Sequence, residues 1–211
     1  MKRGIIVGAA PCDLKNLNPT SEDFVIAADG GWDHLQKAGL SADLLVGDFD
    51  SVTHLPSDIP LVRHPVRKDD TDLSLAIGEA LKNGCQALWL YGVTGGRLDH
   101  TLANLQLLCG LSKENHPVFL CDDNCTITAI TNGVIKFKPE ATGIISIFSH
   151  SDRSLGVTLQ GLSYPLDQAT LTSDFPLGVS NEFMGEEAIV QVTCGTLLIH
   201  FSGPPDWVIM E

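Results

Sequence analysis

Two aspartates one residue apart, Asp48 and Asp50, follow Gly47 at the end of a short apolar run. The run AlaAspLeuLeuVal is typical of a buried strand, and carboxylates at the end of such a strand commonly gather a hard cation. Mg²⁺ takes oxygen ligands in an octahedron, which it shares between one or two carboxylates, water and substrate phosphates. The spacing therefore favours metal-assisted phosphoryl chemistry. An isolated pair of this kind is also compatible with a polar turn.

Aspartates recur in segments that follow predicted strands. There are four such segments: AADGG (27–31), GDFDS (47–51), KDDTD (68–72) and GGRLDHTLAN (95–104). In open parallel sheets, ligands bind beyond the carboxyl ends of the strands, so we expect the four segments to converge on one rim. Carboxylates brought close together repel one another unless a cation neutralises them. The pattern therefore predicts a bound divalent metal.

The stretch from Tyr91 to His100 follows a buried strand and opens a helix. Gly95 and Gly96 let the backbone approach a ligand closely, and the first N–H groups of a helix form an anion site. Arg97 adds a planar fork of donors suited to phosphate. The same residues also fit a plain strand-to-helix turn with a surface arginine, and His100 fits a histidine satisfied by local hydrogen bonds. Neither GxxxxGK[ST] nor GxGxxG occurs, so nucleotide binding would use another device.

Asp69 and Asp70 precede a helix that we expect to begin near Thr71. One of the pair is expected to be the N-cap, where a carboxylate accepts from the helix N–H groups and favours the dipole. Asp72, one position into the helix, points either at solvent or at the shared rim.

Apolar runs of strand length alternate with helical patterns through the first 120 residues. The predicted strands cover 4–9, 24–28, 44–46, 87–91 and 118–121, and the predicted helices cover 32–38, 71–83 and 98–111. Continuous apolar strands suit a parallel sheet covered on both faces. We therefore predict an α/β domain at 1–122, with an open, mainly parallel Rossmann-like sheet and flanking helices.

After Asp122 the runs become short, β-branched or alternating. They cover 126–131, 134–137, 144–148, 155–159, 188–192 and 196–201, with glycines and Asn132 between them. This texture predicts a smaller all-β sandwich domain at 123–211. By composition, the segment GVSNEF (178–183) is only a turn.

The formal charge of −13 argues against nucleic acid or an anionic membrane as the main partner, since both require a basic surface. No apolar run reaches the ~18 residues of a membrane span, and the opening residues do not form a signal peptide, so we expect a cytoplasmic protein. The six cysteines form no CxxC pair, which indicates reduced thiols rather than zinc ligands or disulfides.

Taken together, the four aspartate segments resemble the thiamine pyrophosphokinase family. Members of that family transfer a pyrophosphoryl group from ATP to the hydroxyethyl group of thiamine, giving thiamine pyrophosphate and AMP. The segments occur here in the family's order and at approximately its spacing, and the resemblance covers effectively the whole chain. The β half matches more loosely, mainly through Val179, Ser180 and Asn181 and the closing strands.

The resemblance implies roles for individual residues. Asp48, Asp50 and Asp72 match the family's Mg²⁺-binding acids. Asp29 matches the DGG aspartate of the active site, and Asp72 and Asp99 are candidates for accepting the hydroxyl proton. Ser180 and Asn181 match the loop that meets thiamine. The ATP-binding stretch matches Lys68, Asp69, Thr94, Gly95, Gly96, Arg97, Asp99, His100 and Asn104.

The resemblance also implies that 1–122 binds ATP and Mg²⁺, that 123–211 binds thiamine, and that the protein is a homodimer with an active site shared between subunits. Trp32 departs from the pattern, because a smaller residue is expected after DGG. Two other readings stay open: a pyrophosphokinase for another heterocyclic alcohol such as a pterin, and a non-catalytic ATP or thiamine sensor.

Overall fold

The computed structural model describes residues 1–49, 56–63 and 71–210. Asp50, Lys68 and Asp69, which the sequence places in the site, lie outside the described residues. The chain divides into two compact units, Met1–Leu107 and Leu108–Glu211. The division falls within a helix, whereas the sequence suggested a boundary after residue 122.

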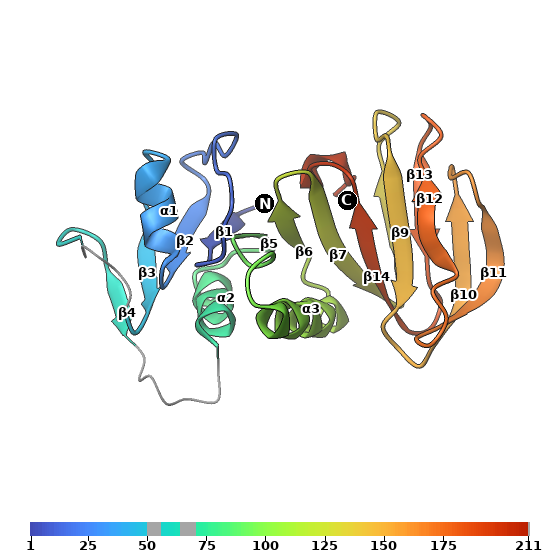
Figure 1. Ribbon diagram of the computed structural model, residues 1–211, viewed down its shortest axis with the longest axis horizontal. Coiled ribbons are helices and arrows are strands. Elements are labelled where there is room, and N and C mark those ends of the chain that lie inside the picture. The colour runs from blue at the N-terminus through green and yellow to red at the C-terminus, as the bar shows by residue number, and fades with distance from the viewer. Residues whose placement is uncertain (50–55, 64–70, 211) are drawn as a thin grey trace. The chain divides into compact units, whose positions relative to one another are not determined.

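The first unit is a sheet with helices packed on it (Figure 1). Its strands are β1 (Arg3–Val7), β2 (Phe24–Ala28), β3 (Leu44–Gly47), β4 (Leu61–Arg63) and β5 (Ala87–Tyr91), and its helices are α1 (Gly31–Lys37), α2 (Asp72–Lys82) and the start of α3 (Leu98–Lys113). These strands lie in the order β5-β1-β2-β3-β4, and each neighbouring pair is parallel.

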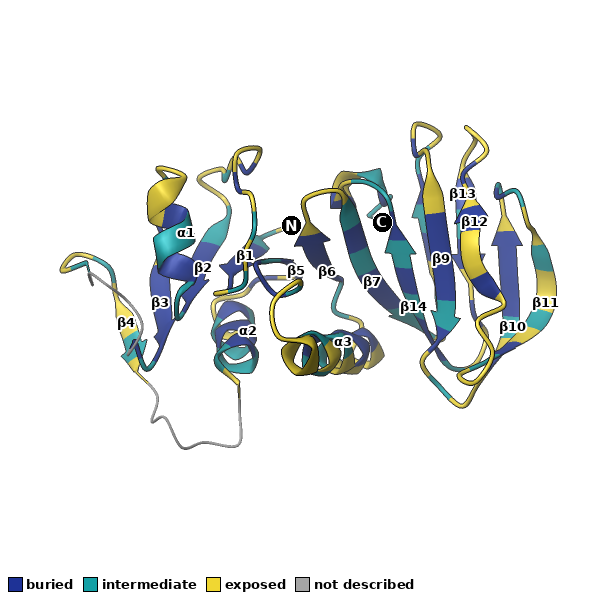
Figure 2. Ribbon diagram, viewed as in Figure 1, coloured by how far each residue is buried: buried dark blue, intermediate teal, exposed yellow. Residues whose placement is uncertain are grey.

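The apolar runs form β1, β2, β3 and β5 because both faces of these four strands are buried, whereas the short β4 is largely exposed (Figure 2). Ile5 of β1 and Val25 of β2 belong to one core cluster with Trp32 and Leu35 of α1. Helix α2 also contacts β1, β2 and β3. This packing fixes the carboxyl ends of the strands, where the aspartate segments begin.

The second unit consists of two antiparallel sheets. Its strands are β6 (Val118–Asp122), β7 (Cys125–Thr131), β8 (Val134–Phe137), β9 (Ile144–Ser149), β10 (Arg153–Gln160), β11 (Leu166–Thr172), β12 (Gly178–Glu182), β13 (Ala188–Gln191) and β14 (Thr196–Phe201), followed by the short helix η1 (Pro205–Trp207). The sheet orders within this unit are β12-β9-β14-β7-β6 and β11-β10-β13-β8.

Aromatic side chains pack between the two antiparallel sheets. The ring centroids of Phe137 on β8 and Phe201 on β14 are 5.1 Å apart, and Phe183 lies 5.2 Å from Phe137. Phe137 and Phe201 are fully buried, so they form the centre of this core. Edge-to-face packing of this kind adds to the free energy gained from burial alone.

One sequence-based assignment was wrong in this unit and one was confirmed. The strand predicted at 118–121 is β6, and it pairs antiparallel with β7. Only Asp123 and Asn124 separate the two strands, and so short a connection makes a hairpin, whereas a parallel pair needs a long crossover. The segment 178–183 was assigned to a turn, but it forms β12. The broader prediction of an α/β part followed by an antiparallel β part is confirmed.

None of the six cysteines forms a disulfide, and burial raises the pKa of the Cys109 thiol to about 11. Within the ranges the structure describes, no helix is both long and apolar enough to cross a membrane.

Candidate active site

A cavity of about 470 Å³ opens in the first unit, beyond the carboxyl ends of β1, β2 and β5. Residues of the turns after these strands and the N-terminal turns of α2 and α3 line it. Six residues that the sequence placed in the site are among them: Asp29, Asp72, Gly96, Arg97, His100 and Asn104. The expected convergence of the AADGG, KDDTD and GGRLDHTLAN segments is thus present for their described residues.

The floor of this cavity is made of closely packed backbone. The N–H of Gly8 donates to the carbonyl of Tyr91 at 2.7 Å, and that of Ala10 donates to the carbonyl of Gly92 at 2.9 Å. A Cβ atom at Gly92 would lie only 2.6 Å from the carbonyl oxygen of Gly8. Glycine is required here because no side chain fits between the two turns.

Asp29 is held in an uncommon backbone conformation at the end of β2. Its φ is 48°, and its N–H donates to the carbonyl of Val46 at 2.9 Å. Two residues later, a Cβ atom at Gly31 would meet the carbonyl oxygen of Val7 at 1.8 Å. The AADGG segment therefore lets α1 start directly against β1. Strained non-glycine backbone of this kind is found preferentially at functional sites.

Asp48 follows β3, next to the turn that carries Asp29. A Cβ atom at Gly47 would be 3.2 Å from the Cα of Asp29, so the two turns touch. Among the described residues, no group of three or more Asp, Glu, His or Cys side chains is arranged so that it could hold a metal ion. The predicted metal set of Asp48, Asp50 and Asp72 includes Asp50, whose placement is not described. The carboxylate oxygens of Asp48 and Asp72 are the hard donors that Mg²⁺ prefers.

Helix α2 is capped by Thr71, whose hydroxyl accepts from the N–H of Ser74 at 3.1 Å. This contradicts the assignment of the N-cap to Asp69 or Asp70. Thr71 is one position further along and is itself a strong N-cap residue. Asp72 then occupies the first helical position and lines the cavity, which resolves its orientation in favour of the rim.

Arg97 and Asp99 form a two-pronged ion pair at the start of α3. The guanidinium Nη2 lies 2.6 Å from Oδ2 of Asp99, and Nε lies 3.1 Å from Oδ1. The N–H of His100 also donates to Oδ1 of Asp99, at 3.0 Å. The hydrogen bond from Arg97 lowers the pKa of Asp99 to about 2. Both side chains are exposed, so the pair remains accessible to a ligand.

Asn104 is the most buried of the predicted ATP-binding residues that the structure describes, with 8% of its surface exposed. Its amide Nδ2 donates to the carbonyl of Val93 at 2.8 Å, across the turn between β5 and α3. Asn104 therefore anchors the glycine-rich turn to the first helical turns of α3.

The predicted thiamine residues lie around a different cavity, in the second unit. Ser180 and Asn181 of β12 line a cavity of about 400 Å³, together with Tyr164, Leu177 and Val179 among others. Tyr164 is 68% exposed, whereas Asn181 is 3% exposed. An aromatic ring and aliphatic side chains thus border a site that also carries the hydroxyl of Ser180.

Comparison with known proteins finds two family domains along the chain. The family description "Thiamin pyrophosphokinase, catalytic domain" matches residues 16–120, and "Thiamin pyrophosphokinase, vitamin B1 binding domain" matches residues 133–199. A curated thiamine pyrophosphokinase of Bacillus subtilis is 32% identical, over 94% of this chain and 98% of its own. The chain belongs to the thiamin pyrophosphokinase family.

Solved structures of thiamin pyrophosphokinases agree with this assignment. The structure from Bacillus subtilis has a TM-score of 0.83 at 29% identity, covering 97% of this chain and 100% of that one. The structure from Geobacillus thermodenitrificans has a TM-score of 0.82 at 25% identity, covering 98% and 100%.

Not every predicted site residue lines the first cavity. Asp48, Thr94, Gly95 and Asp99 are absent from the described residues that line it. Trp32, the departure from the family pattern, belongs to the core cluster beneath α1 instead of the cavity wall.

Sequence reasoning missed several contributors to these cavities, among them the turn 8–11 and Tyr164. The turn 8–11 after β1 lines the first cavity. The feature of the sequence that could have indicated this turn is Gly8, near the end of the first apolar run. Tyr164 lines the second cavity, and its sequence gave no periodic signal because it lies in the connection between β10 and β11.

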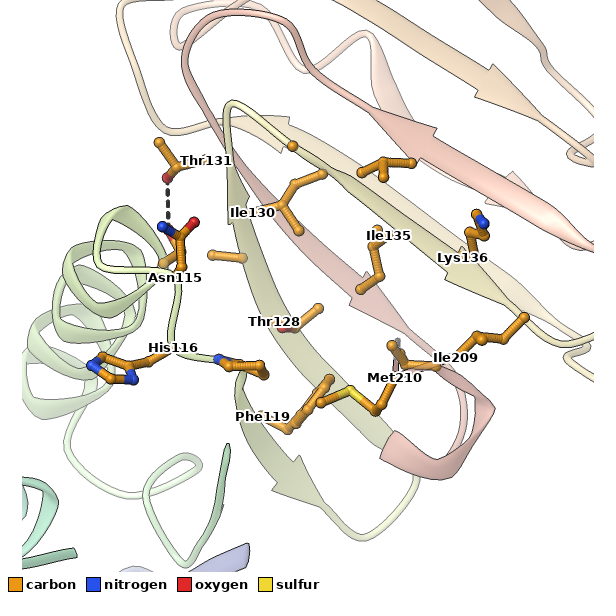
Figure 3. A pocket seen from close by; sticks show the side chains of 16 residues that line it. Asn115, His116, Phe119, Thr128, Ile130, Thr131, Ile135, Lys136, Ile209 and Met210 are labelled. Atoms are coloured by element: carbon orange, nitrogen blue, oxygen red, sulfur yellow. Dashed lines mark hydrogen bonds between the residues drawn. The ribbon is translucent and has the colours of Figure 1, made fainter. Parts of the chain in front are cut away.

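A third cavity, of about 280 Å³, lies in the second unit (Figure 3). Its walls include Ile130, Ile135 and Met210, and the hydroxyls of Ser112 and Thr131 share a hydrogen bond of 2.8 Å at its edge. No residue predicted to bind ATP, thiamine or metal is among the described residues that line it.

Proposed function

We propose that this protein transfers a pyrophosphoryl group from ATP to the hydroxyethyl group of thiamine, giving thiamine pyrophosphate and AMP. One observation carries the proposal: a single chain matches both family domains, and each domain contains a cavity that some of the residues selected by the family resemblance line.

ATP is assigned to the cavity of about 470 Å³ in the first unit. The N-terminal turn of α3 supplies backbone N–H groups and the guanidinium of Arg97 supplies a planar donor fork, and both suit phosphate oxygens. Asn104 holds the turn in place. Lys68 and Asp69 remain part of the proposal on the resemblance alone.

Mg²⁺ is assigned to Asp48, Asp50 and Asp72. The donor set fits in kind, because carboxylate oxygens are the hard donors that Mg²⁺ prefers, and water and substrate phosphates can complete its octahedron. When bound, the ion would neutralise charge on the phosphate oxygens. Asp29, whose backbone is fixed against Val46, lies in the neighbouring turn.

In this reaction the thiamine hydroxyl oxygen attacks the β phosphorus. The bond from that phosphorus to the oxygen bridging the α and β phosphates breaks, and AMP leaves with that oxygen. Arg97 and the N–H groups of α3 stabilise the charge that builds up, and such electrostatic positioning provides most of the catalysis in phosphoryl transfer. Asp99, with a pKa of about 2, is a weak base. Asp72, which lines the cavity, is the other candidate for accepting the hydroxyl proton.

Thiamine is assigned to the cavity of about 400 Å³ beside Ser180 and Asn181. Its thiazolium ring is positively charged, and the net charge of −13 favours the approach of a cation. The aromatic and aliphatic side chains around the cavity suit its two rings.

We also propose a cytoplasmic homodimer in which the α/β half of one subunit faces the β half of the other. Exposed apolar side chains in the second unit support a protein contact there: Ile144, Tyr164, Phe175, Leu177, Val179 and Met184. The lack of disulfides among the six cysteines fits a reducing compartment.

A thermal-shift assay tests the choice of substrate. With ATP and Mg²⁺ present, thiamine is expected to raise the melting temperature, whereas a hydroxymethyl pterin is expected to leave it unchanged. Stabilisation by the pterin alone would replace thiamine in this proposal. Stabilisation by thiamine without consumption of ATP would indicate a sensor.

A further inference from the structure

Beside the second cavity, strand β12 has one residue more than the stretch of β9 that pairs with it. Gly178 pairs with Ile147 and Asn181 pairs with Ile145, so three steps along β12 match two steps along β9. The extra residue makes a β-bulge, and Ser180 has a positive φ of 56° within it. Bulges redirect side chains and are frequent beside functional sites.

Ser146 on β9 stabilises this bulge. A bulge leaves an N–H of the bulged strand without its ladder partner, and here the N–H of Ser180 donates to the Oγ of Ser146 at 3.0 Å. Ser146 is 6% exposed and does not line the cavity, whereas Ser180 is exposed and does. The buried hydroxyl of Ser146 therefore influences the cavity only by holding Ser180 in place.

Asn181 uses its side-chain amide on the neighbouring backbone. Its Oδ1 accepts from the N–H of Tyr164 and from the N–H of Glu182, each at 2.9 Å, and its Nδ2 donates to the carbonyl of Tyr164 at 2.7 Å. Because Asn181 bonds both backbone groups of Tyr164, it fixes where the exposed tyrosine ring enters the cavity. These bonds use the amide's polar atoms, leaving little capacity for a ligand.

We infer that Ser146 and Asn181 are positioning residues of the thiamine site, which hold Ser180 and Tyr164 in place as the groups that meet the substrate. This inference rests on the proposed function and changes one part of it, since the family resemblance gave Asn181 a direct contact with thiamine. Ser146 affects the site only by stabilising the bulge that carries Ser180.

The test is steady-state kinetics on the full-length protein with ATP, Mg²⁺ and thiamine. Ser146→Ala is expected to raise the KM for thiamine roughly tenfold, the effect of losing one hydrogen bond, with the KM for ATP unchanged. Ser146→Thr, which keeps the hydroxyl, should restore the KM. The matched control is Ser149→Ala on the same strand, because the Ser149 hydroxyl is also buried but bonds Ser151 and Ser154.

Double variants separate positioning from contact. If Ser146 acts through Ser180, adding Ser146→Ala to Ser180→Ala should raise the KM for thiamine no further. Likewise, adding Asn181→Ala to Tyr164→Ala should leave the KM of the single Tyr164 variant unchanged. Independent, multiplying effects would overturn the inference. If Asn181→Ala does not fold, Asn181→Asp tests the same bond, since it removes the donor to the Tyr164 carbonyl.

The inference and the proposed function fail in different ways. A wild-type protein that makes thiamine pyrophosphate, combined with an unchanged KM in Ser146→Ala, would overturn the inference alone. A wild-type protein that neither turns over nor binds thiamine in calorimetry would overturn the proposed function and the inference together.

Discussion

Arg97 and Asp99 face each other across the first turn of α3, joined by hydrogen bonds of 2.6 and 3.1 Å. The hydrogen bond from the guanidinium holds the pKa of Asp99 at about 2. Because the folded pKa is lowered, the pair favours the folded state above the usual carboxyl pKa, and this contribution is lost as pH falls towards about 2. Asp99 therefore stays ionised through the neutral range.

The first prediction concerns Asp99→Asn. Because Asp99 does not titrate near neutrality, the variant should keep the same inflections in its profile of kcat/KM from about pH 5 to about pH 9. Asp13→Asn is the matched control, because Asp13 is an exposed acid paired with Lys15 at 2.8 Å. Loss of the acidic inflection in Asp99→Asn alone would make Asp99 the general base.

Asn104→Ala should weaken ATP binding through the turn that Asn104 anchors. Loss of the hydrogen bond to the Val93 carbonyl leaves a buried acceptor unsatisfied, which costs about 1–3 kcal/mol. We expect a higher KM for ATP and an unchanged KM for thiamine. Ser112→Ala is the control on the same helix, since its buried hydroxyl bonds Cys109. Equal effects on both substrates would show general destabilisation instead.

Gly31→Ala should destabilise the fold, because the new Cβ would lie 1.8 Å from the Val7 carbonyl oxygen. Relief requires a backbone shift, and we expect a loss of about 3 kcal/mol in the free energy of unfolding, measured with urea. Gly78→Ala is the control: nothing lies within 4 Å of its Cβ position in α2, and it should gain about 0.5–1 kcal/mol. A stable Gly31→Ala variant would refute the close contact between α1 and β1.

Asp48→Ala and Asp72→Ala should each abolish Mg²⁺-dependent turnover, with losses of at least about a hundredfold. The far-ultraviolet circular dichroism should be unchanged, because both residues lie at the ends of elements and not in the core. Asp33→Ala removes an acid from α1 that does not line the cavity and serves as the control. Normal magnesium dependence in either site variant would contradict the metal assignment.

The α/β half was readable from sequence because its strands are continuous apolar runs and its helices have a clear period. The strands at 24–28 and 87–91 have the predicted bounds, and the helix expected over 98–111 runs to Lys113. The carboxyl ends of the strands indicated where the site lies, so Asp29 and Arg97 could be placed together before their geometry was known, whereas the orientation of Asp72 stayed open.

The β half was less readable because its site depends on pairing between distant residues. Strand β12 carries small and polar residues, and only the ladder with β9 makes it a strand. Neither the bulge at Ser180 nor the bond to Ser146, which is 34 positions away in the chain, leaves a local pattern.

The most direct test of the central claim is a product assay. The protein is incubated with ATP, Mg²⁺ and thiamine, and AMP and thiamine pyrophosphate are separated by chromatography over time. Equal amounts of the two products, both dependent on thiamine, are the predicted result. Formation of ADP with thiamine monophosphate, or no thiamine-dependent product, would contradict pyrophosphoryl transfer.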